Sequence, residues 1–155
     1  MTEQVVLRPI GLVVGGRTEV ADDDWGRETA VIRLDAEQYT AEAVRGLEAF
    51  SHLEVVFHFH KVAPEKIETT ARRPRGNPDW PEVGIFAQRG KNRPNRLGVS
   101  RCRLLGVDGL EVRVAGLDAV DGTPVLDLKP WLAEFGPLGE TAQPEWATEL
   151  MREYY

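Results

Sequence analysis

Residues 97–117 read LGVSRCRLLGVDGLEVRVAGL and carry the clearest fold signal in the chain. Two runs rich in β-branched and aliphatic residues lie on either side of the pair Asp108-Gly109. An Asp-Gly pair between two such runs is typical of a tight turn between antiparallel strands. The stretch therefore predicts a β-hairpin that turns at Asp108-Gly109.

Further short strands are predicted on both sides of this hairpin. They cover residues 5–14 (VVLRPIGLVV), 29–34 (TAVIRL), 53–60 (LEVVFHFH), 83–88 (VGIFAQ) and 124–131 (PVLDLKPW). Each is rich in side chains that suit a pleated sheet, and turn-forming residues separate them. The passage 62–82 contains four prolines, which exclude a continuous helix.

Helices are predicted in only two places. Residues 36–50 (AEQYTAEAVRGLEAF) have one apolar face, formed by Tyr39, Ala43, Leu47 and Phe50. Gly46 lies inside this run and costs about 1 kcal/mol relative to Ala, so the helix would break there. A short helix is expected from Pro144 onward. The predicted fold is mainly β: a small antiparallel β-barrel with one main helix and a short C-terminal helix.

The length and composition indicate a single domain over residues 1–155. The chain has a mass of 17.3 kDa with 42% hydrophobic and 28% charged residues, which excludes disorder or a coiled coil for the whole chain. No apolar run is long enough for a membrane helix, and residues 1–30 lack a signal-peptide pattern. Cys102 is the only cysteine, so neither an internal disulfide nor a four-thiolate zinc site can form. These features predict a cytoplasmic protein with no membrane partner.

Positive charge is concentrated in one band of an otherwise acidic chain. The net charge is −6, yet residues 72–103 contain nine Lys and Arg side chains against two acidic ones. Such a band indicates a phosphate-bearing partner, with a solvated arginine-rich loop as the alternative.

Common cofactor and metal motifs are not found. There is neither a GxGxxG sequence after a strand nor a GxxxxGK[ST] loop. His58 and His60 alternate on a predicted strand, an arrangement that can present metal ligands, but no third ligand at a fixed spacing accompanies them. Structural histidines are the favoured interpretation, and no metal is expected. Cys102 lies between two arginines in a predicted strand and is interpreted as a packing residue.

Three longer blocks are more specific. They are AVRGLEAFSHLEVVFHFH (43–60), GIFAQRGKNRPNRLGVS (84–100) and LDAVDGTPVLDLKPW (117–131). In this order and at these separations they resemble the TrmO/TsaA-like (YaeB-like) family. The resemblance implies a homodimeric β-barrel methyltransferase that uses S-adenosyl-L-methionine. It also implies methylation of N6 of threonylcarbamoyladenosine at position 37, in the anticodon loop of tRNA.

The resemblance also implies site residues. The cofactor-binding candidates are Phe59, His60, Lys61, Arg89, Asp121, Gly122, Thr123 and Pro124. The positive band, rather than the resemblance, supplies the nucleic-acid candidates Arg72, Arg73, Arg75, Arg93 and Arg96. The proton acceptor is left open between His60 and Asp121. Trp80 and Phe86 are candidates to stack on a loop base, with core packing favoured for Phe86.

Three departures from the family pattern leave the acceptor open. The family's N-terminal Pro-Arg-Gln has no counterpart in residues 15–28, and Lys61 replaces a glutamine. The family's FRPNPIG segment reads NRPNRLG at residues 92–98. The alternatives are an S-adenosylmethionine-binding barrel with a small-molecule acceptor, and a non-catalytic RNA-binding module.

Overall fold

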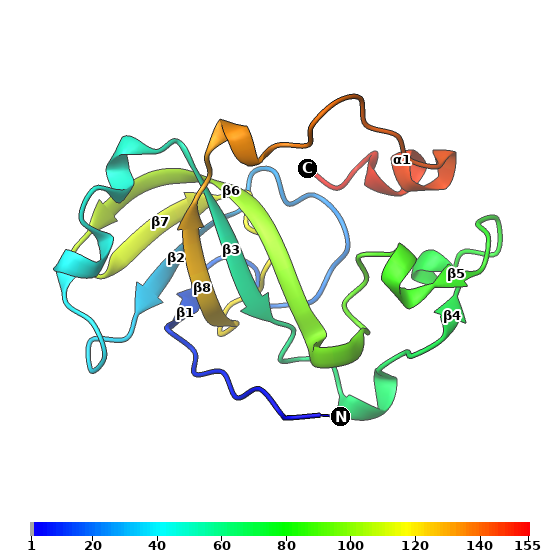
Figure 1. The fold of residues 1–155 in the computed structure, drawn as a ribbon, viewed down its shortest axis with the longest axis horizontal. Coiled ribbons are helices and arrows are strands. Elements are labelled where there is room, and N and C mark those ends of the chain that lie inside the picture. Colours follow the sequence, from blue (N-terminus) through cyan, green and yellow to red (C-terminus); the bar gives the residue numbers. More distant parts are fainter. Residues whose placement is uncertain (1) are drawn as a thin grey trace.

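Six strands close into an antiparallel barrel in this computed structural model, which describes residues 2–155. The strand order around the barrel is β1-β2-β7-β6-β3-β8 (Figure 1). The strands are β1 (Gly11–Val14), β2 (Thr29–Leu34), β3 (His52–His58), β6 (Leu97–Asp108), β7 (Glu111–Ala115) and β8 (Pro124–Pro130). The predicted fold class is therefore confirmed.

The hairpin predicted at Asp108-Gly109 joins β6 to β7. Asp108 pairs with Glu111, and Gly109 has a φ of 60°, which glycine adopts without strain. The register shifts between Leu104 and Gly106, so β6 bends across the barrel. The turn chemistry of this stretch thus fixes the pairing of the longest strand.

The core lies inside the barrel and follows the alternation of the strands. Along β3, Leu53, Val55 and Phe57 point inward, while the residues between them are partly exposed. Burying an aliphatic or aromatic side chain in this way stabilises the fold by about 1.5–3 kcal/mol. Val112 and Val114 on β7 meet them from another wall of the same cluster.

The barrel closes through a short seam between β1 and β8. Only Gly11 with Val125 and Leu12 with Pro124 pair there. The turn before β8 extends the seam, because Gly122 N–H donates to the Val13 carbonyl at 2.7 Å.

The helix predicted over residues 36–50 is wrong. The segment forms two single 3₁₀ turns, η1 (Ala41–Val44) and η2 (Leu47–Ala49). Gly46 separates them with a φ of 89°, so the break expected at this glycine is present. Tyr39, Val44 and Leu47 still pack against the core cluster.

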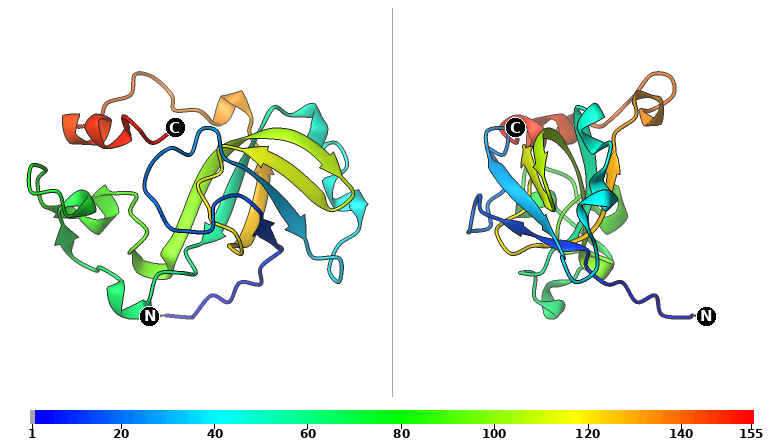
Figure 2. Two further views of the ribbon diagram at one scale, coloured as in Figure 1. Left: turned by 180° about the vertical axis from the view of Figure 1, so that it is seen from behind. Right: turned by 90° about the vertical axis from the view of Figure 1, so that its left-hand side faces the viewer.

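Two predicted strands are shorter than expected. The first begins at Gly11, and residues 2–9 run exposed along the outside as an extended N-terminal segment that projects from the barrel (Figure 2). The strand predicted at 83–88 is only β5 (Val83–Gly84), followed by the 3₁₀ turn η5 (Ile85–Ala87).

Residues 61–96 leave the barrel between β3 and β6 and are called the outer loop below. They contain the two-stranded sheet of β4 (Ala71–Arg72) and β5. The remaining short turns are η3 (Pro64–Lys66), η4 (Pro74–Gly76), η6 (Pro94–Arg96) and, beyond β8, η7 (Ala133–Phe135).

The C-terminal strap, residues 144–155, contains the only α-helix of the described residues, α1 (Glu145–Met151). It lies beside the outer loop at one end of the barrel (Figures 1 and 2). Within residues 2–155, no helix has the length and apolar character needed to cross a bilayer.

Candidate ligand-binding cleft

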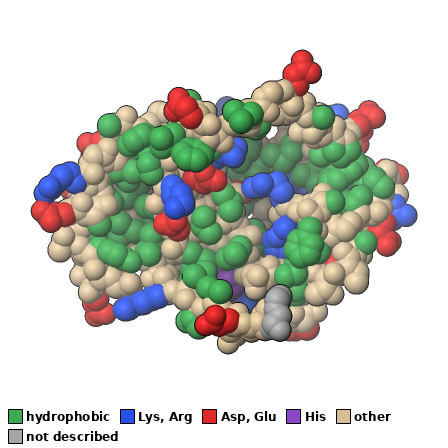
Figure 3. Space-filling model, viewed as in Figure 1, with side chains coloured by type: hydrophobic (Ala, Val, Ile, Leu, Met, Phe, Trp, Pro, Cys, Tyr) green, Lys and Arg blue, Asp and Glu red, His purple; other side chains and the backbone are tan. Residues whose placement is uncertain are grey.

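A large cleft of about 1810 Å³ separates the barrel from the outer loop and the strap. The open ends of β3 and β6 form one wall, and residues of the outer loop form the other. Lys and Arg side chains gather around the hollow in the middle of this face, between apolar surfaces (Figure 3). The cleft therefore combines apolar walls with positive charge, as expected of a site for a ligand with both an aromatic and an anionic part.

Phe59, His60 and Lys61 enter the cleft where the chain leaves β3. Phe59 donates its N–H to the Arg96 carbonyl at 2.8 Å and packs edge-to-face on Phe57 at 5.3 Å. Gly98 makes room for both rings, since a Cβ there would lie 2.6 Å from Phe57 and 2.9 Å from Phe59. The packing of these rings therefore sets the direction in which the next residue, His60, leaves the strand.

His60 is held as a neutral base. Burial lowers the pKa of its imidazole first, and the charge of Lys61 lowers it further. His58 behaves alike, with its pKa lowered by burial and then by Arg96. The imidazole of His60 is therefore free to accept a proton at neutral pH.

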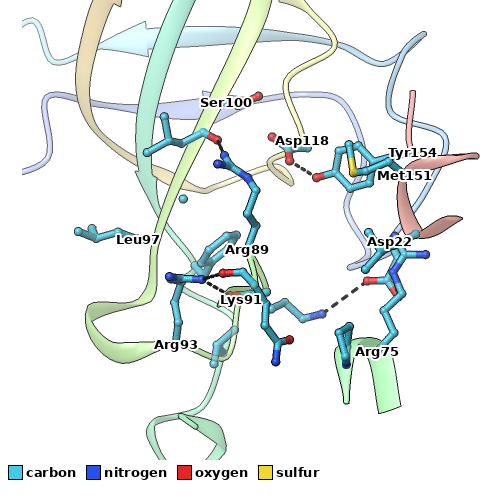
Figure 4. A pocket seen from close by; sticks show the side chains of 18 of the residues that line it. Asp22, Arg75, Arg89, Lys91, Arg93, Leu97, Ser100, Asp118, Met151 and Tyr154 are labelled. Carbon is cyan, nitrogen blue, oxygen red and sulfur yellow. Dashed lines mark hydrogen bonds and ion pairs between the residues drawn. The ribbon is translucent and has the colours of Figure 1, made fainter. Parts of the chain in front are cut away.

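Arg89 and Arg93 line the cleft from the outer loop. Arg89 donates to the Val99 carbonyl of β6 at 2.9 Å, and Arg93 donates to the Gln88 carbonyl at 2.7 Å (Figure 4). Each bond uses one nitrogen of a five-donor guanidinium, so further donors remain for an anionic group.

The Asp121–Pro124 motif lies mostly outside the cleft lining. The Asp121 carboxylate accepts the Gly15 N–H at 2.8 Å, which ties it to the turn after β1. Gly122 lies next to His60, since a Cβ there would be 3.8 Å from Nε2. Of the four residues, only the buried Thr123 lines the cleft. The motif thus supports the cleft from behind, and His60 rather than Asp121 faces the ligand space.

The predicted nucleic-acid arginines are largely occupied by the chain itself. Arg75 forms a two-fold ion pair with Asp23 at 2.9 and 3.1 Å. Arg73 donates to the Pro78 and Trp80 carbonyls, and Arg96 donates to the Val62 carbonyl at 2.7 Å. Arg72, Arg73, Arg75 and Arg93 line the cleft, whereas Arg96 does not.

The loop before β2 supplies a further wall. Arg17 stacks over the buried Trp25 at 4.0 Å and pairs with Glu28 at 3.0 Å. Lys61 donates its Nζ to the Thr18 carbonyl at 2.6 Å, which holds this loop. Trp25 lines the cleft from the same loop.

The interpretation of Phe86 as a core residue is wrong. Its side chain is 77% exposed and lies at the cleft. Trp80 is tied to the strap, because its indole N–H donates to Glu149 at 2.8 Å. Phe86 is therefore the free aromatic surface at this edge of the cleft.

Sequence reasoning missed several cleft residues, among them Ser100, Asp118 and Tyr154. Ser100 and Asp118 lie inside quoted blocks, but neither the spacing nor the residue type set them apart. Tyr154 lies in the tail, far from any of the blocks. Its hydroxyl donates to the Asp118 carboxylate (Figure 4).

The described residues contain neither a cluster of metal ligands nor a reactive thiol. Within residues 2–155, no three His, Cys, Asp or Glu side chains converge on a possible metal position. Burial raises the pKa of the Cys102 thiol to about 12, with a smaller contribution from Asp118, so the thiol stays protonated and inert.

A closed antiparallel barrel with a cationic cleft at one end defines a small β-barrel ligand-binding domain, a class unrelated to the doubly wound sheets that bind cofactors on glycine-rich loops. Residues 23–136 match the family described as tRNA-methyltransferase O N-terminal domain. Because the match covers most of the sequence, the chain belongs to this family, as the resemblance indicated.

Curated relatives agree with this assignment. A protein of Escherichia coli strain K12 named tRNA (adenine(37)-N6)-methyltransferase is 44% identical over 107 residues, which make up 65% of this chain and 44% of that protein. A protein of Methanothermobacter thermautotrophicus named probable S-adenosyl-L-methionine-binding protein is 33% identical over 140 residues, 88% of this chain and 96% of that protein.

The solved structures extend the likeness to three dimensions. A crystal structure of TrmO from Pseudomonas aeruginosa has a TM-score of 0.73 and 28% identity, covering 90% of this chain and 61% of that one. The chain spans less than half the length of the Escherichia coli relative and 23% of a human protein of the same name.

Proposed function

We propose that the chain is an S-adenosyl-L-methionine-dependent methyltransferase that acts on N6 of threonylcarbamoyladenosine 37 in tRNA. The observation that carries the proposal is the family membership over residues 23–136, joined to one cleft in which distant family blocks meet. His60, Arg89 and Thr123 come from three separate blocks and line the same cavity.

The cleft residues fit the cofactor. Phe59, which is only partly buried, offers apolar surface for an adenine ring, and Arg89 offers donors for the cofactor's carboxylate. Asp118 Oδ1, a buried acceptor, and the buried hydroxyl of Ser100 have no hydrogen-bond partner among the described residues, which suits an ammonium or hydroxyl group. When bound, the cofactor supplies a methyl group on a positively charged sulfur.

His60 is the proposed proton acceptor. The target nitrogen carries an adenine ring and a carbamoyl group, so it is a poor nucleophile until its proton is removed. His60 lines the cleft with its pKa lowered, whereas the Asp121 carboxylate is engaged by the Gly15 N–H outside the lining. His60 therefore accepts the proton, and the cleft walls orient the acceptor and exclude water.

The substrate tRNA would meet the cationic rim of the cleft. Phe86 offers a stacking surface for an unpaired loop base. Arg72, Arg73 and Lys91 line the same cleft and would contact phosphates in a salt-dependent manner. The threonyl carboxylate of the substrate suits the forked guanidinium of Arg93, which lines the same cleft.

The second candidate is methylation of a small molecule by the same cofactor. The pairing of Arg75 with Asp23 favours it, because charges already neutralised within the chain contribute little to RNA binding. The non-catalytic RNA-binding module is disfavoured by the intact His60 and its cleft.

We also propose a homodimer in the cytoplasm. The N-terminal segment supports a partner surface, since Val5 is 79% and Val6 86% exposed in an extended, unpaired stretch. Analytical ultracentrifugation at micromolar concentration tests whether the protein is a dimer. If it is, removal of residues 2–9 is expected to yield a monomer, which would assign the dimer surface to this segment.

Titration calorimetry with S-adenosylmethionine, with ATP as the control ligand, tests the cofactor. Saturable micromolar binding is expected for S-adenosylmethionine alone. The next step is mass spectrometry of tRNA nucleosides after incubation with the enzyme and cofactor. A methyl group on threonylcarbamoyladenosine supports the tRNA assignment. Cofactor binding without any nucleoside product would favour the small-molecule acceptor.

A further inference from the structure

The C-terminal strap closes one side of the cleft, although it lies beyond residue 136, where the family match ends. Its backbone is fixed to the loop before β2, because Asp24 N–H donates to the Glu153 carbonyl and Trp25 N–H to the Tyr154 carbonyl, both at 2.8 Å. The indole of Trp80 holds it from the side of the outer loop. The strap is therefore a built wall of the site rather than a loose tail.

Tyr154 reaches from this wall to the floor of the cleft. Its hydroxyl donates to Oδ2 of Asp118, while Oδ1 of the same carboxylate is buried and has no partner among residues 2–155. Ser100, which is 3% exposed, leaves its Oγ unpartnered on the same cleft lining. Figure 4 shows the free carboxylate oxygen turned away from Tyr154, toward the side of Ser100.

A buried carboxylate oxygen without a donor is costly in a folded protein. Such an oxygen is explained where a ligand supplies the missing donor. The chemistry that fits it is an N–H donor, above all an ammonium or an exocyclic amino group.

We propose that Tyr154 is a positioning residue that holds the Asp118 carboxylate so that Oδ1 accepts a hydrogen bond from an amino group of the bound ligand. This inference rests on the proposed methyltransferase function. The amino group belongs either to the cofactor or to the acceptor nucleoside, and the two sources are separated by the test below.

The surroundings keep Tyr154 in the donor state. Burial raises the pKa of its phenol well above the usual range, and the Asp118 charge raises it further. The hydroxyl therefore stays protonated and keeps donating to Oδ2. With one oxygen engaged, rotation of the carboxylate would break a charge-assisted hydrogen bond, so Oδ1 keeps its direction.

A double-mutant cycle tests the inference. The variants are Tyr154→Phe, Asp118→Asn and the double variant, with Tyr39→Phe as a matched control whose hydroxyl lies away from the cleft and contacts Gln38. Cofactor affinity is measured by calorimetry, and KM for tRNA is measured at saturating cofactor. Tyr154→Phe is expected to weaken one of these by about tenfold, the value for loss of a hydrogen bond to a charged group. In the Asp118→Asn background the same change is expected to have an effect below about threefold.

The readout identifies the source of the amino group. A change confined to cofactor affinity assigns it to the cofactor, and a change confined to KM assigns it to the acceptor. Tyr39→Phe is expected to match the parent protein in both. Hydrogen exchange of the Asp24 and Trp25 amides should stay slow in Tyr154→Phe, because the strap's backbone bonds remain.

Three outcomes would overturn the inference. Tyr154→Phe with unchanged affinity and KM would show that the hydroxyl positions nothing. An equal loss in both backgrounds, or fast exchange at Asp24 and Trp25, would show that the ring merely packs the strap. A parent protein that binds no cofactor and methylates no tRNA would instead overturn the proposed function itself, so the two failures are distinguishable.

Discussion

The barrel and the outer loop are stabilised by different interactions. In the barrel, continuous strand pairing surrounds a buried apolar cluster that includes Ile32, Val112 and Val114. The outer loop has only two strand pairs and is held by side chains that donate to backbone carbonyls. Arg93 and Arg96 do so at 2.7 Å, and Gln88 binds two carbonyls at 2.9 and 3.0 Å.

Because of this difference, the barrel is expected to determine the stability of the fold, whereas the outer loop determines access of a ligand to the cleft. An apolar core is destabilised most by truncation of a buried side chain, which leaves a cavity. A loop held by polar bonds is destabilised most by removal of a hydrogen-bond donor or acceptor. The cleft lies between the two, with one wall built by strand pairing and the other by side-chain hydrogen bonds. The following changes test that division, from the largest expected effect to the smallest.

Ile32→Ala should have the largest effect on stability. Ile32 is 0% exposed in β2, and truncation of such a residue costs about 2–5 kcal/mol of unfolding free energy. Urea unfolding followed by circular dichroism measures it. Its neighbour Arg33 gives the control, because Arg33→Ala removes only an exposed ion pair with Glu111 and should cost less than about 1 kcal/mol. Equal losses would contradict an apolar barrel core.

Gln88→Met should loosen the outer loop with a smaller effect. The change keeps the side-chain volume but leaves the Arg72 and Val83 carbonyls without their donor, which costs about 1–3 kcal/mol. Faster proteolytic cleavage within residues 62–82 is expected, at native conditions. Gln4→Met on the exposed N-terminal segment is the control. Unchanged cleavage in Gln88→Met would mean that the loop does not depend on these bonds.

Replacing Asp22 and Asp23 by Asn should strengthen tRNA binding several-fold. Arg75 and Lys91 pair with these carboxylates and would then be free for phosphates. The slope of log affinity against log salt should become more negative by about one to two, the change expected for one to two added phosphate contacts. Filter binding over a salt series measures both quantities. Glu37→Gln, an exposed carboxylate between β2 and η1, serves as the control. Weaker binding by the double variant would show that the ion pairs are needed for the RNA surface.

Acid should destabilise the protein gradually. The folded state lowers the pKa of His58 and His60 below the usual 6.5, so the unfolded chain binds protons more readily. Stability is therefore full above pH 6.5 and falls as the pH drops through that value toward the folded pKa. His60→Gln should flatten this dependence in urea midpoints measured between pH 7.5 and 5.5. An unchanged slope would mean that His60 is not desolvated.

The same division explains what the sequence could predict. Strand alternation and the Asp108-Gly109 turn are local signals, so the barrel could be predicted. The 36–50 helix failed because Gly46 has a φ of 89°, a left-handed conformation that ends the helical run and leaves a single turn on either side. The partners of Arg75 and Arg96, Asp23 and Val62, depend on how distant segments meet, which composition does not encode. Tyr154 does not belong to any recognisable sequence motif, and it contacts Asp118 only in the folded chain.

The seam of the barrel has a mechanical consequence. The barrel is closed only where β1 pairs with β8, so this short pairing is expected to be the weakest point of the ring of strands. The family's Asp-Gly-Thr-Pro segment contributes to it, since Asp121 and Gly122 each bind the β1 end of the chain. Under a pulling force applied at the N-terminus, β1 should separate from the barrel first, and the bonds from Asp121 and Gly122 to this strand end would break with it. Because Gly122 lies next to His60, such a force would displace a residue of the cleft.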